Sequence, residues 1–208
     1  MFVKICGITN IRDAYLCAEA GADAIGLNFY SGSKRFIPFD DAASIVREVA
    51  AYVTTVAVMV RPTLPDVLQA FDATEVDAVQ VYEPQFALSD FDLRKMIYFS
   101  VRVKDSDDVR SASVIGADLI FLDAFKQNEF GGTGELSKWD EIVRSGIDLT
   151  SRFVISGGLT DANVCDAIRT LRPYGVDTAS GVEESPRKKD HDKVRKFISN
   201  AKQCRIGG

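Results

Sequence analysis

Short apolar runs alternate with longer amphipathic segments along the whole chain, and this alternation limits the possible folds more than any other feature. Eight runs are rich in Val, Ile and Phe and mostly continuous in apolarity, as in parallel strands that are covered on both faces. They span residues 2–6, 24–29, 53–60, 78–82, 97–103, 119–123, 153–156 and 176–179. The pattern predicts an α/β fold with a parallel sheet.

The segments between these runs carry helix signals of uneven strength. Asn10 is a candidate N-cap for a helix that Gly21 ends, and Thr160 is a candidate N-cap for a later helix. The signals over residues 86–95 and 106–115 are weaker, so we expect the fourth helix to be short or irregular.

A three-residue turn is repeated immediately before the even-numbered strand candidates. It reads GAD at 21–23, EVD at 75–77, GAD at 116–118 and GVD at 175–177. A spacing of roughly 40 to 60 residues is the length of two βα units, which predicts one closed (βα)8 barrel, a TIM barrel, over residues 1–208. An open doubly wound sheet is the alternative, but none of the eight runs is polar enough for an edge strand.

Composition limits which binding partners and which cellular compartment we expect for this chain. The formal charge is −5 and no long basic run is present, so a nucleic-acid surface is not expected. No apolar run reaches the roughly 18 residues of a membrane span, and the N-terminus lacks a signal-peptide pattern. We therefore expect a cytoplasmic protein with a small-molecule ligand and no membrane association.

Cysteine and histidine usage argues against a metal centre. The four cysteines form no C-x-x-C pair, which disfavours both a zinc site and a disulfide scaffold. His191 is the single histidine and lies in the polar stretch KKDHDK, where a surface position is expected. The sequence predicts no metal and no cofactor.

Two strand-end residues are candidates for catalysis. Cys6 is the last residue of the first strand candidate and Asp123 the last of the sixth. Active sites of (βα)8 barrels lie at the carboxyl ends of the strands, so this position favours chemistry over simple packing. Burial at the end of an apolar strand would raise the pKa of Asp123 and keep a proton available, although Asp123 could instead only bind the following loop.

Glycine-rich segments follow the last two strand candidates. Gly157 and Gly158 come after the seventh, and Ser180 and Gly181 after the eighth. Backbone N–H groups in such loops approach anions closely, and barrels commonly hold phosphate there. We predict a phosphate site at these loops.

A third glycine-rich cluster, FGGTGEL at 130–136, is interpreted as a mobile lid.

Two charged residues are candidates for substrate binding. Arg35 follows the second strand candidate, where a guanidinium could bind a carboxylate bidentately, although such a residue alone is commonly solvated. Asp177 ends the fourth repeated turn, and the recurrence of Asp23, Asp77 and Asp118 indicates a structural role for the set. Asp177 also enters the strand nearest the predicted phosphate site, so we retain it as a candidate.

The ordered set of motifs resembles one family. KICGIT at 4–9, SKR at 33–35, LD at 122–123, GGTG at 131–134, GGL at 157–159 and PYGVDTASGVE at 173–183 follow its order from Lys4 to about Glu183. The family is phosphoribosylanthranilate isomerase, a (βα)8 barrel of tryptophan biosynthesis. One departure is VQVYE at 79–83, where the family usually reads close to V-Q-L-H-G, so that Tyr82 replaces a histidine that can carry charge.

The resemblance implies an Amadori rearrangement of N-(5-phosphoribosyl)anthranilate without cofactor or metal. Asp123 would protonate the furanose oxygen and Cys6, helped by Lys4, would remove the C2′ proton. Arg35 would bind the anthranilate carboxylate. The phosphate would be bound by Gly157, Gly158, Ser180 and Gly181.

Three alternatives remain open from the sequence. A related barrel isomerase could act on the histidine-pathway ribosylamine or on both substrates. A sugar-phosphate aldolase would need a desolvated lysine nucleophile, for which Lys104 is the serious candidate. A barrel that only binds a phosphorylated ligand would need neither Cys6 nor Asp123.

Overall fold

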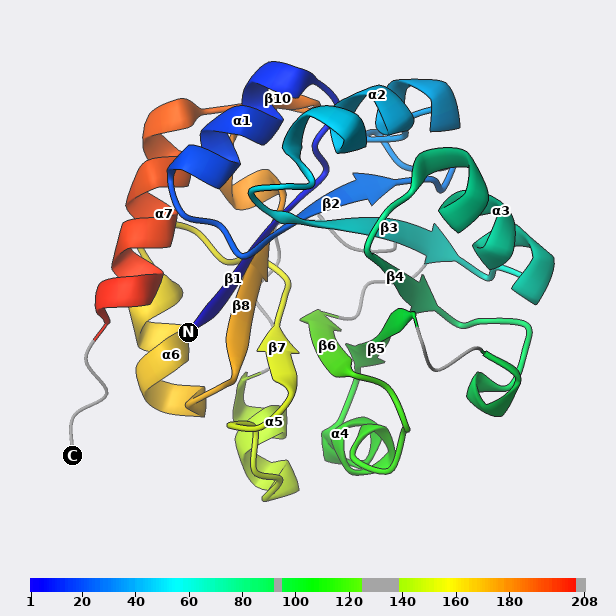
Figure 1. The fold of residues 1–208 in the computed structure, drawn as a ribbon. Coiled ribbons are helices and arrows are strands. Elements are labelled where there is room, and N and C mark those ends of the chain that lie inside the picture. Colours follow the sequence, from blue (N-terminus) through cyan, green and yellow to red (C-terminus); the bar gives the residue numbers. More distant parts are fainter. Residues whose placement is uncertain (92–94, 125–138, 205–208) are drawn as a thin grey trace.

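The computed structural model describes residues 1–91, 95–124 and 139–204, and its eight parallel strands close into a barrel in sequence order (Figure 1). The strands are β1 (Phe2–Cys6), β2 (Ala24–Asn28), β3 (Thr54–Val60), β4 (Ala78–Tyr82), β5 (Met96–Val103), β6 (Leu119–Ala124), β7 (Phe153–Ile155) and β8 (Gly175–Thr178). Pairing of β1 with β8 closes the ring. The predicted barrel is confirmed, and each predicted strand lies within two residues of an observed one at both ends.

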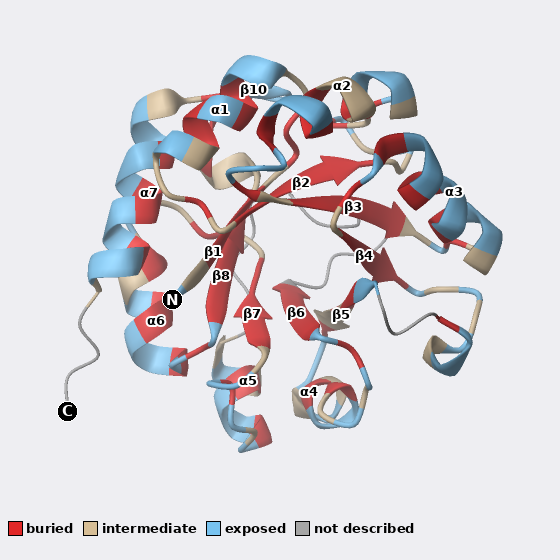
Figure 2. Cartoon of the chain, in the orientation of Figure 1, coloured by how far each residue is buried: buried red, intermediate tan, exposed pale blue. Residues whose placement is uncertain are grey.

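The helices surround the ring of strands, with their exposed faces turned outward (Figures 1 and 2). They are α1 (Ile11–Glu19), α2 (Phe39–Val49), α3 (Leu64–Thr74), α4 (Ser106–Ala112), α5 (Trp139–Ser145), α6 (Val164–Leu171) and α7 (His191–Gln203). Between β4 and β5 the described residues form only a 3-10 turn, η1 (Leu88–Asp90), as expected for the weak fourth helix. A second 3-10 turn, η2 (Ser180–Val182), and an antiparallel ribbon of β9 (Glu183–Ser185) and β10 (Lys188–Lys189) follow β8.

Capping confirms one predicted helix start and corrects another. The Asn10 side chain accepts a hydrogen bond from the Asp13 backbone N–H at 2.9 Å, and α1 begins at the next residue. The predicted start at Thr160 is wrong. Asn163 accepts the Thr160 backbone N–H at 2.8 Å, so a turn forms first and α6 begins only at Val164.

The repeated Asp turn has a structural role. Three carboxylates each accept the backbone N–H of the second residue of the preceding odd-numbered strand. These bonds join Asp23 to Val3 at 2.8 Å, Asp77 to Thr55 at 2.8 Å and Asp118 to Ile97 at 2.7 Å. Asp177 departs from the set because it lies inside β8, opposite Lys4 of β1. The repeat therefore fixes the amino ends of β1, β3 and β5, and Asp177 is left for another role.

The barrel interior changes character along its axis. At the amino ends of the strands a buried apolar cluster includes Val56, Tyr98 and Phe121. Side chains two residues apart on a strand share a face, so Lys4 and Cys6 both project toward the axis, closer to the carboxyl ends. Lys4 is fully buried there. The apolar layer thus forms a floor beneath a polar layer.

None of the helices in the described ranges combines the length and the apolar content of a membrane span.

Candidate active site

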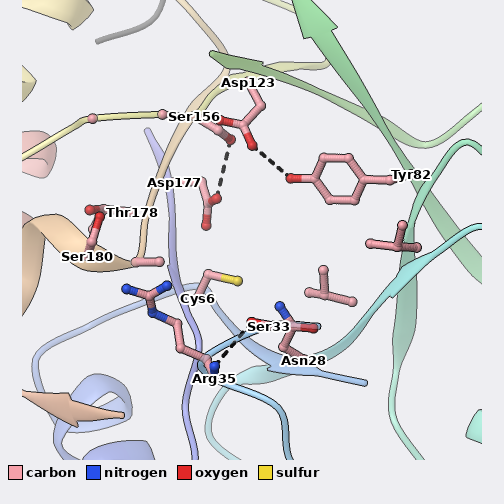
Figure 3. A pocket seen from close by; sticks show the side chains of 15 residues that line it. Cys6, Asn28, Ser33, Arg35, Tyr82, Asp123, Ser156, Asp177, Thr178 and Ser180 are labelled. Atoms are coloured by element: carbon pink, nitrogen blue, oxygen red, sulfur yellow. Dashed lines mark hydrogen bonds between the residues drawn. The ribbon is translucent and has the colours of Figure 1, made fainter. Parts of the chain in front are cut away.

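A pocket opens at the carboxyl ends of the strands and collects most of the predicted site residues (Figure 3). Its lining includes seven of the eight, namely Cys6, Arg35, Asp123, Gly157, Gly158, Asp177 and Ser180. The eighth, Gly181, is not part of the lining. Arg35 and Glu183 are 148 positions apart in the sequence and meet at this mouth. The site is therefore assembled by closure of the barrel.

Cys6 presents its sulfur to the middle of the pocket (Figure 3). Its strand partner is Gly26 of β2. A Cβ atom at position 26 would lie 2.7 Å from the Cys6 Sγ and 3.2 Å from the Lys4 Cε. Gly26 therefore leaves the space that the thiol occupies.

The charge state of Cys6 is set by opposing effects. Burial raises the pKa of the thiol, the Lys4 ammonium acts to lower it, and the Asp177 carboxylate raises it again; the outcome is a raised pKa. Lys4 was expected to give the thiol modest help toward ionisation. Lys4 acts in that direction, but burial outweighs it, and Cys6 is a neutral thiol at neutral pH.

Lys4 and Asp177 form a buried ion pair beneath the pocket. Lys4 Nζ lies 2.9 Å from Asp177 Oδ1, and the Ser156 hydroxyl donates to Asp177 Oδ2 at 3.2 Å. Burial acts to lower the pKa of Lys4, but Asp177 and Cys6 outweigh it and raise that pKa. A permanent positive charge therefore lies under Cys6, on the same face of the same strand.

Asp123 approaches the pocket from the far side of the ring. The residue is 3% exposed, and the Tyr82 hydroxyl donates to its Oδ2 at 2.9 Å (Figure 3). Burial raises the pKa of Tyr82 well above its usual value, so the phenol stays neutral. Asp123 is therefore a buried carboxyl group at the pocket wall, held by a neutral donor.

Arg35 is fixed by a carboxylate from the ribbon after β8. Its Nε donates to Glu183 Oε1 at 2.8 Å and its Nη2 to Glu183 Oε2 at 2.6 Å. Lys189 Nζ also donates to Glu183, and to the backbone carbonyls of Cys6 at 2.7 Å and Ala179 at 3.0 Å. Burial acts to raise the pKa of Glu183, but Arg35 and Lys189 hold it below its usual value.

This arrangement refines the prediction for Arg35. The bidentate carboxylate partner in the structure is Glu183, which uses two of the guanidinium nitrogens. Among the described residues no bond is formed by Nη1, and Arg35 lines the pocket. A ligand carboxylate would therefore meet a guanidinium that is already oriented.

The glycine-rich loops lie next to one another at the ends of β7 and β8. Gly157 and Gly158 adopt φ angles of 87° and 68°, in the left-handed region that favours glycine. Gly181 lies behind the pocket, where a Cβ atom would come within 1.8 Å of the Leu159 carbonyl oxygen. The predicted pair of loops is thus a tightly packed unit, although no regular helix begins directly at Gly158.

Other predicted residues lie outside the pocket or outside the described ranges. Lys104 is exposed and does not line the pocket, which does not match the desolvated lysine that an aldolase needs. The predicted lid at 130–136 lies outside the described residues. His191 is half-buried rather than fully solvated, with its ring 3.1 Å from Asp13. In the described ranges, no three His, Cys, Asp or Glu side chains are grouped as metal ligands.

Sequence reasoning missed several residues that build the site. Lys4 was expected to help Cys6, but its place in the pocket floor was not predicted, although strand alternation puts it on the inward face with Cys6. Glu183 and Lys189 carried no such signal, because they lie in the ribbon beyond β8 rather than at a strand end. The contact between Tyr82 and Asp123 was also missed, because the two residues lie on different strands and no sequence motif links them.

Comparison with known proteins identifies close relatives. The family model for N-(5'phosphoribosyl)anthranilate isomerase matches residues 3–200. The N-(5'-phosphoribosyl)anthranilate isomerase of Pelobacter propionicus is 39% identical over 206 residues, covering 98% of this chain and 96% of that protein. The Thermotoga maritima enzyme of the same name is 40% identical over 202 residues, covering 96% and 98%.

Solved structures agree with these relatives. The crystal structure of phosphoribosyl anthranilate isomerase from Thermotoga maritima superposes with a TM-score of 0.85 at 37% identity, covering 97% of this chain and 98% of that chain. A second crystal structure of such an isomerase contains reduced 1-(o-carboxyphenylamino)-1-deoxyribulose 5-phosphate. It matches with a TM-score of 0.82 at 35% identity, covering 97% and 98%.

Proposed function

Because this chain belongs to the N-(5'-phosphoribosyl)anthranilate isomerase family, we propose that Cys6 and Asp123 carry out the proton transfers of its isomerisation. The reaction is the Amadori rearrangement of N-(5-phosphoribosyl)anthranilate to 1-(2-carboxyphenylamino)-1-deoxyribulose 5-phosphate, a step of tryptophan biosynthesis. The observation that carries the assignment is that these two side chains, from β1 and β6, line one pocket together with the glycine-rich loops.

The first step opens the ribose ring. Asp123 donates a proton to the furanose oxygen, the bond from that oxygen to C1′ breaks, and the anthranilate nitrogen supplies the electron pair for an iminium ion. The buried position of Asp123 suits a carboxyl group that must hold a proton until it is used. The step leaves a carboxylate at Asp123 and a positive charge on the substrate.

The second step removes the C2′ proton. Cys6, as thiolate, takes this proton, the iminium is neutralised to an enolamine, and tautomerisation with protonation at C1′ gives the ketone. The raised pKa makes Cys6 a thiol in the free enzyme, so its proton must first pass to solvent, and solvent in turn returns a proton to the Asp123 carboxylate. Lys4 and Lys189 both favour the thiolate. The iminium ion adds a third positive charge beside it, so ionisation is favoured only after the ring has opened.

The two ends of the substrate have different surroundings in the pocket. Val58, Val60 and the Tyr82 ring form an apolar wall of the pocket suited to the anthranilate ring, and Arg35 lines the same pocket and suits its carboxylate. Backbone N–H groups around Gly158 and Ser180 suit the phosphate. In the proposed orientation C1′ and C2′ would lie between Cys6 and Asp123.

A fluorescence assay tests the activity. Loss of freshly made phosphoribosylanthranilate should be accelerated by the protein, and the histidine-pathway ribosylamine should be assayed alongside with the same preparation. Turnover of the first substrate alone supports a dedicated enzyme. Turnover of the second alone would contradict the assignment, and turnover of both would extend it.

Replacing Glu183 with glutamine is expected to raise KM about tenfold and change kcat much less. An amide cannot accept both guanidinium bonds, so Arg35 would lose its fixed orientation toward the substrate carboxylate. Steady-state kinetics measures the split. Glu184→Gln is the matched control, because Glu184 is exposed and, among the described residues, forms an ion pair only with Lys188. A fall in kcat at unchanged KM would contradict this role of Glu183.

Replacing Gly181 with alanine is expected to weaken phosphate binding by at least about tenfold. The added Cβ meets the Leu159 carbonyl oxygen, a backbone atom that cannot rotate away, so the loop after β8 must shift. Affinity for the product, measured by titration, reports the loss. Gly116→Ala is the control, since nothing lies within 4 Å of a Cβ there. Unaltered affinity in a folded Gly181→Ala protein would remove this loop from the phosphate site.

A further inference from the structure

Tyr82 ends β4 with its phenol inside the active-site pocket and its hydroxyl directed at Asp123 (Figure 3). The residue is 5% exposed. The donor–acceptor distance of 2.9 Å to Asp123 Oδ2 is that of an ordinary hydrogen bond. The reaction steps above give this contact no task.

We propose that Tyr82 is a positioning residue for Asp123, which holds the carboxyl group in one orientation and stabilises the carboxylate that forms when the proton is transferred. The proposal rests on the proposed role of Asp123 as the acid. It concerns a position where this chain carries tyrosine and the family usually carries histidine.

The direction of the hydrogen bond determines which oxygen carries the proton. With the phenol donating to Oδ2, the proton that Asp123 transfers is carried on Oδ1. As negative charge develops on the carboxyl group, the bond from Tyr82 becomes charge-assisted and stronger. Its effect is therefore larger in the transition state than in the ground state, which is the condition for raising kcat.

The phenol can play this part because it does not titrate. Burial raises the pKa of Tyr82 well above its usual value, so the phenol is protonated near neutral pH. Among the described residues, the other titratable groups that line the pocket are Cys6 from β1, Asp177 from β8 and Arg35 from the loop after β2. A histidine at position 82 could change its charge near neutrality, whereas the tyrosine keeps the same O–H donor across that pH range.

The backbone around Tyr82 is fixed on both sides. Residue 82 pairs with Val60 of β3 and Ser100 of β5, and the Arg61 N–H donates to its carbonyl oxygen at 2.8 Å. The next residue, Glu83, has a φ of 48° and forms ion pairs with Arg61 and Arg102. The phenol is therefore placed by a rigid strand end rather than by a loop, as positioning requires.

Tyr82→Phe removes the hydroxyl and leaves the ring. We expect kcat to fall about 10- to 100-fold, while KM changes less than about threefold because the apolar wall is kept. Tyr98→Phe is the matched control. Tyr98 is also buried in the barrel, but its hydroxyl forms a hydrogen bond only with the Met96 sulfur, at 3.8 Å, among the described residues. Its loss should leave both constants unchanged.

A direct titration separates positioning from simple packing. The ¹³C carboxyl signal of Asp123, assigned by its absence in Asp123→Asn, reports the pKa of this group in the free enzyme. Loss of a donor to the carboxylate should raise this pKa by about one unit in Tyr82→Phe and not in Tyr98→Phe.

The two readouts decide the proposal together. A lower kcat with a raised Asp123 pKa supports it. An unchanged kcat, or a lower kcat with an unmoved Asp123 titration, would overturn it. The titration uses no substrate, so it tests the link between Tyr82 and Asp123 even if Asp123→Asn stays active and the acid proves to be another group.

Discussion

Serine in place of Cys6 is expected to lower kcat by roughly 10²- to 10⁴-fold. A serine hydroxyl fits the space that Gly26 leaves for the thiol, but it holds its proton far more tightly. Burial, which already raises the pKa of the thiol, would hinder ionisation of the hydroxyl still more. The apolar wall, Arg35 and the phosphate loops are untouched, so product affinity should be largely kept.

The comparison needs a thiol that lies outside the site. Cys165 of α6 is such a residue, and its thiol donates a hydrogen bond to the Asn200 carbonyl oxygen at 3.3 Å. Cys165→Ser should leave the kinetic constants unchanged. Both variants are measured by the fluorescence assay and by product titration. If Cys6→Ser turned over near the wild-type rate, the base would have to be sought elsewhere in the pocket.

Asparagine in place of Asp123 is expected to lower kcat by a similar factor. The amide has the same shape and can still accept the Tyr82 hydroxyl, but it has no proton to donate to the furanose oxygen. Ring opening would then depend on water in a pocket wall where position 123 is almost inaccessible. The loss should appear in kcat, with product affinity again largely intact.

Asp148→Asn serves as the control for this substitution. Asp148 is exposed and bonds Thr150 at 2.9 Å, away from the barrel mouth. Its replacement should leave turnover unaffected. An Asp123→Asn variant that retained most of the wild-type kcat would show that the ring oxygen receives its proton from another group.

The barrel and its strand ends could be predicted because they follow from local patterns. Continuous apolar runs of four to eight residues fit parallel strands covered on both faces, and the rule that barrels act at the carboxyl ends directed attention to Cys6 and Asp123. The recurrence of Asp23, Asp77 and Asp118 separated structural aspartates from functional ones. Their bonds to the odd strands explain why the turn is repeated.

What could not be predicted depends on contacts between distant parts of the chain. Glu183 meets Arg35 only because β8 returns to β1, and no spacing in the sequence encodes that meeting. The raised pKa of Cys6 results from burial and from Asp177 opposing Lys4, which the strand motif alone does not reveal. The start of α6 was misjudged because Asn163 competes for the backbone of Thr160.

Trapping the open-chain imine tests most directly whether Asp123 opens the ring and Cys6 acts afterwards. Enzyme in excess is mixed with phosphoribosylanthranilate and quenched with borodeuteride, which places deuterium at C1′ of the imine but at C2′ of the ketone product. Cys6→Ser is expected to yield label at C1′ above the enzyme-free background, and Asp123→Asn is not. Label at C1′ from Asp123→Asn, with none from Cys6→Ser, would contradict these roles.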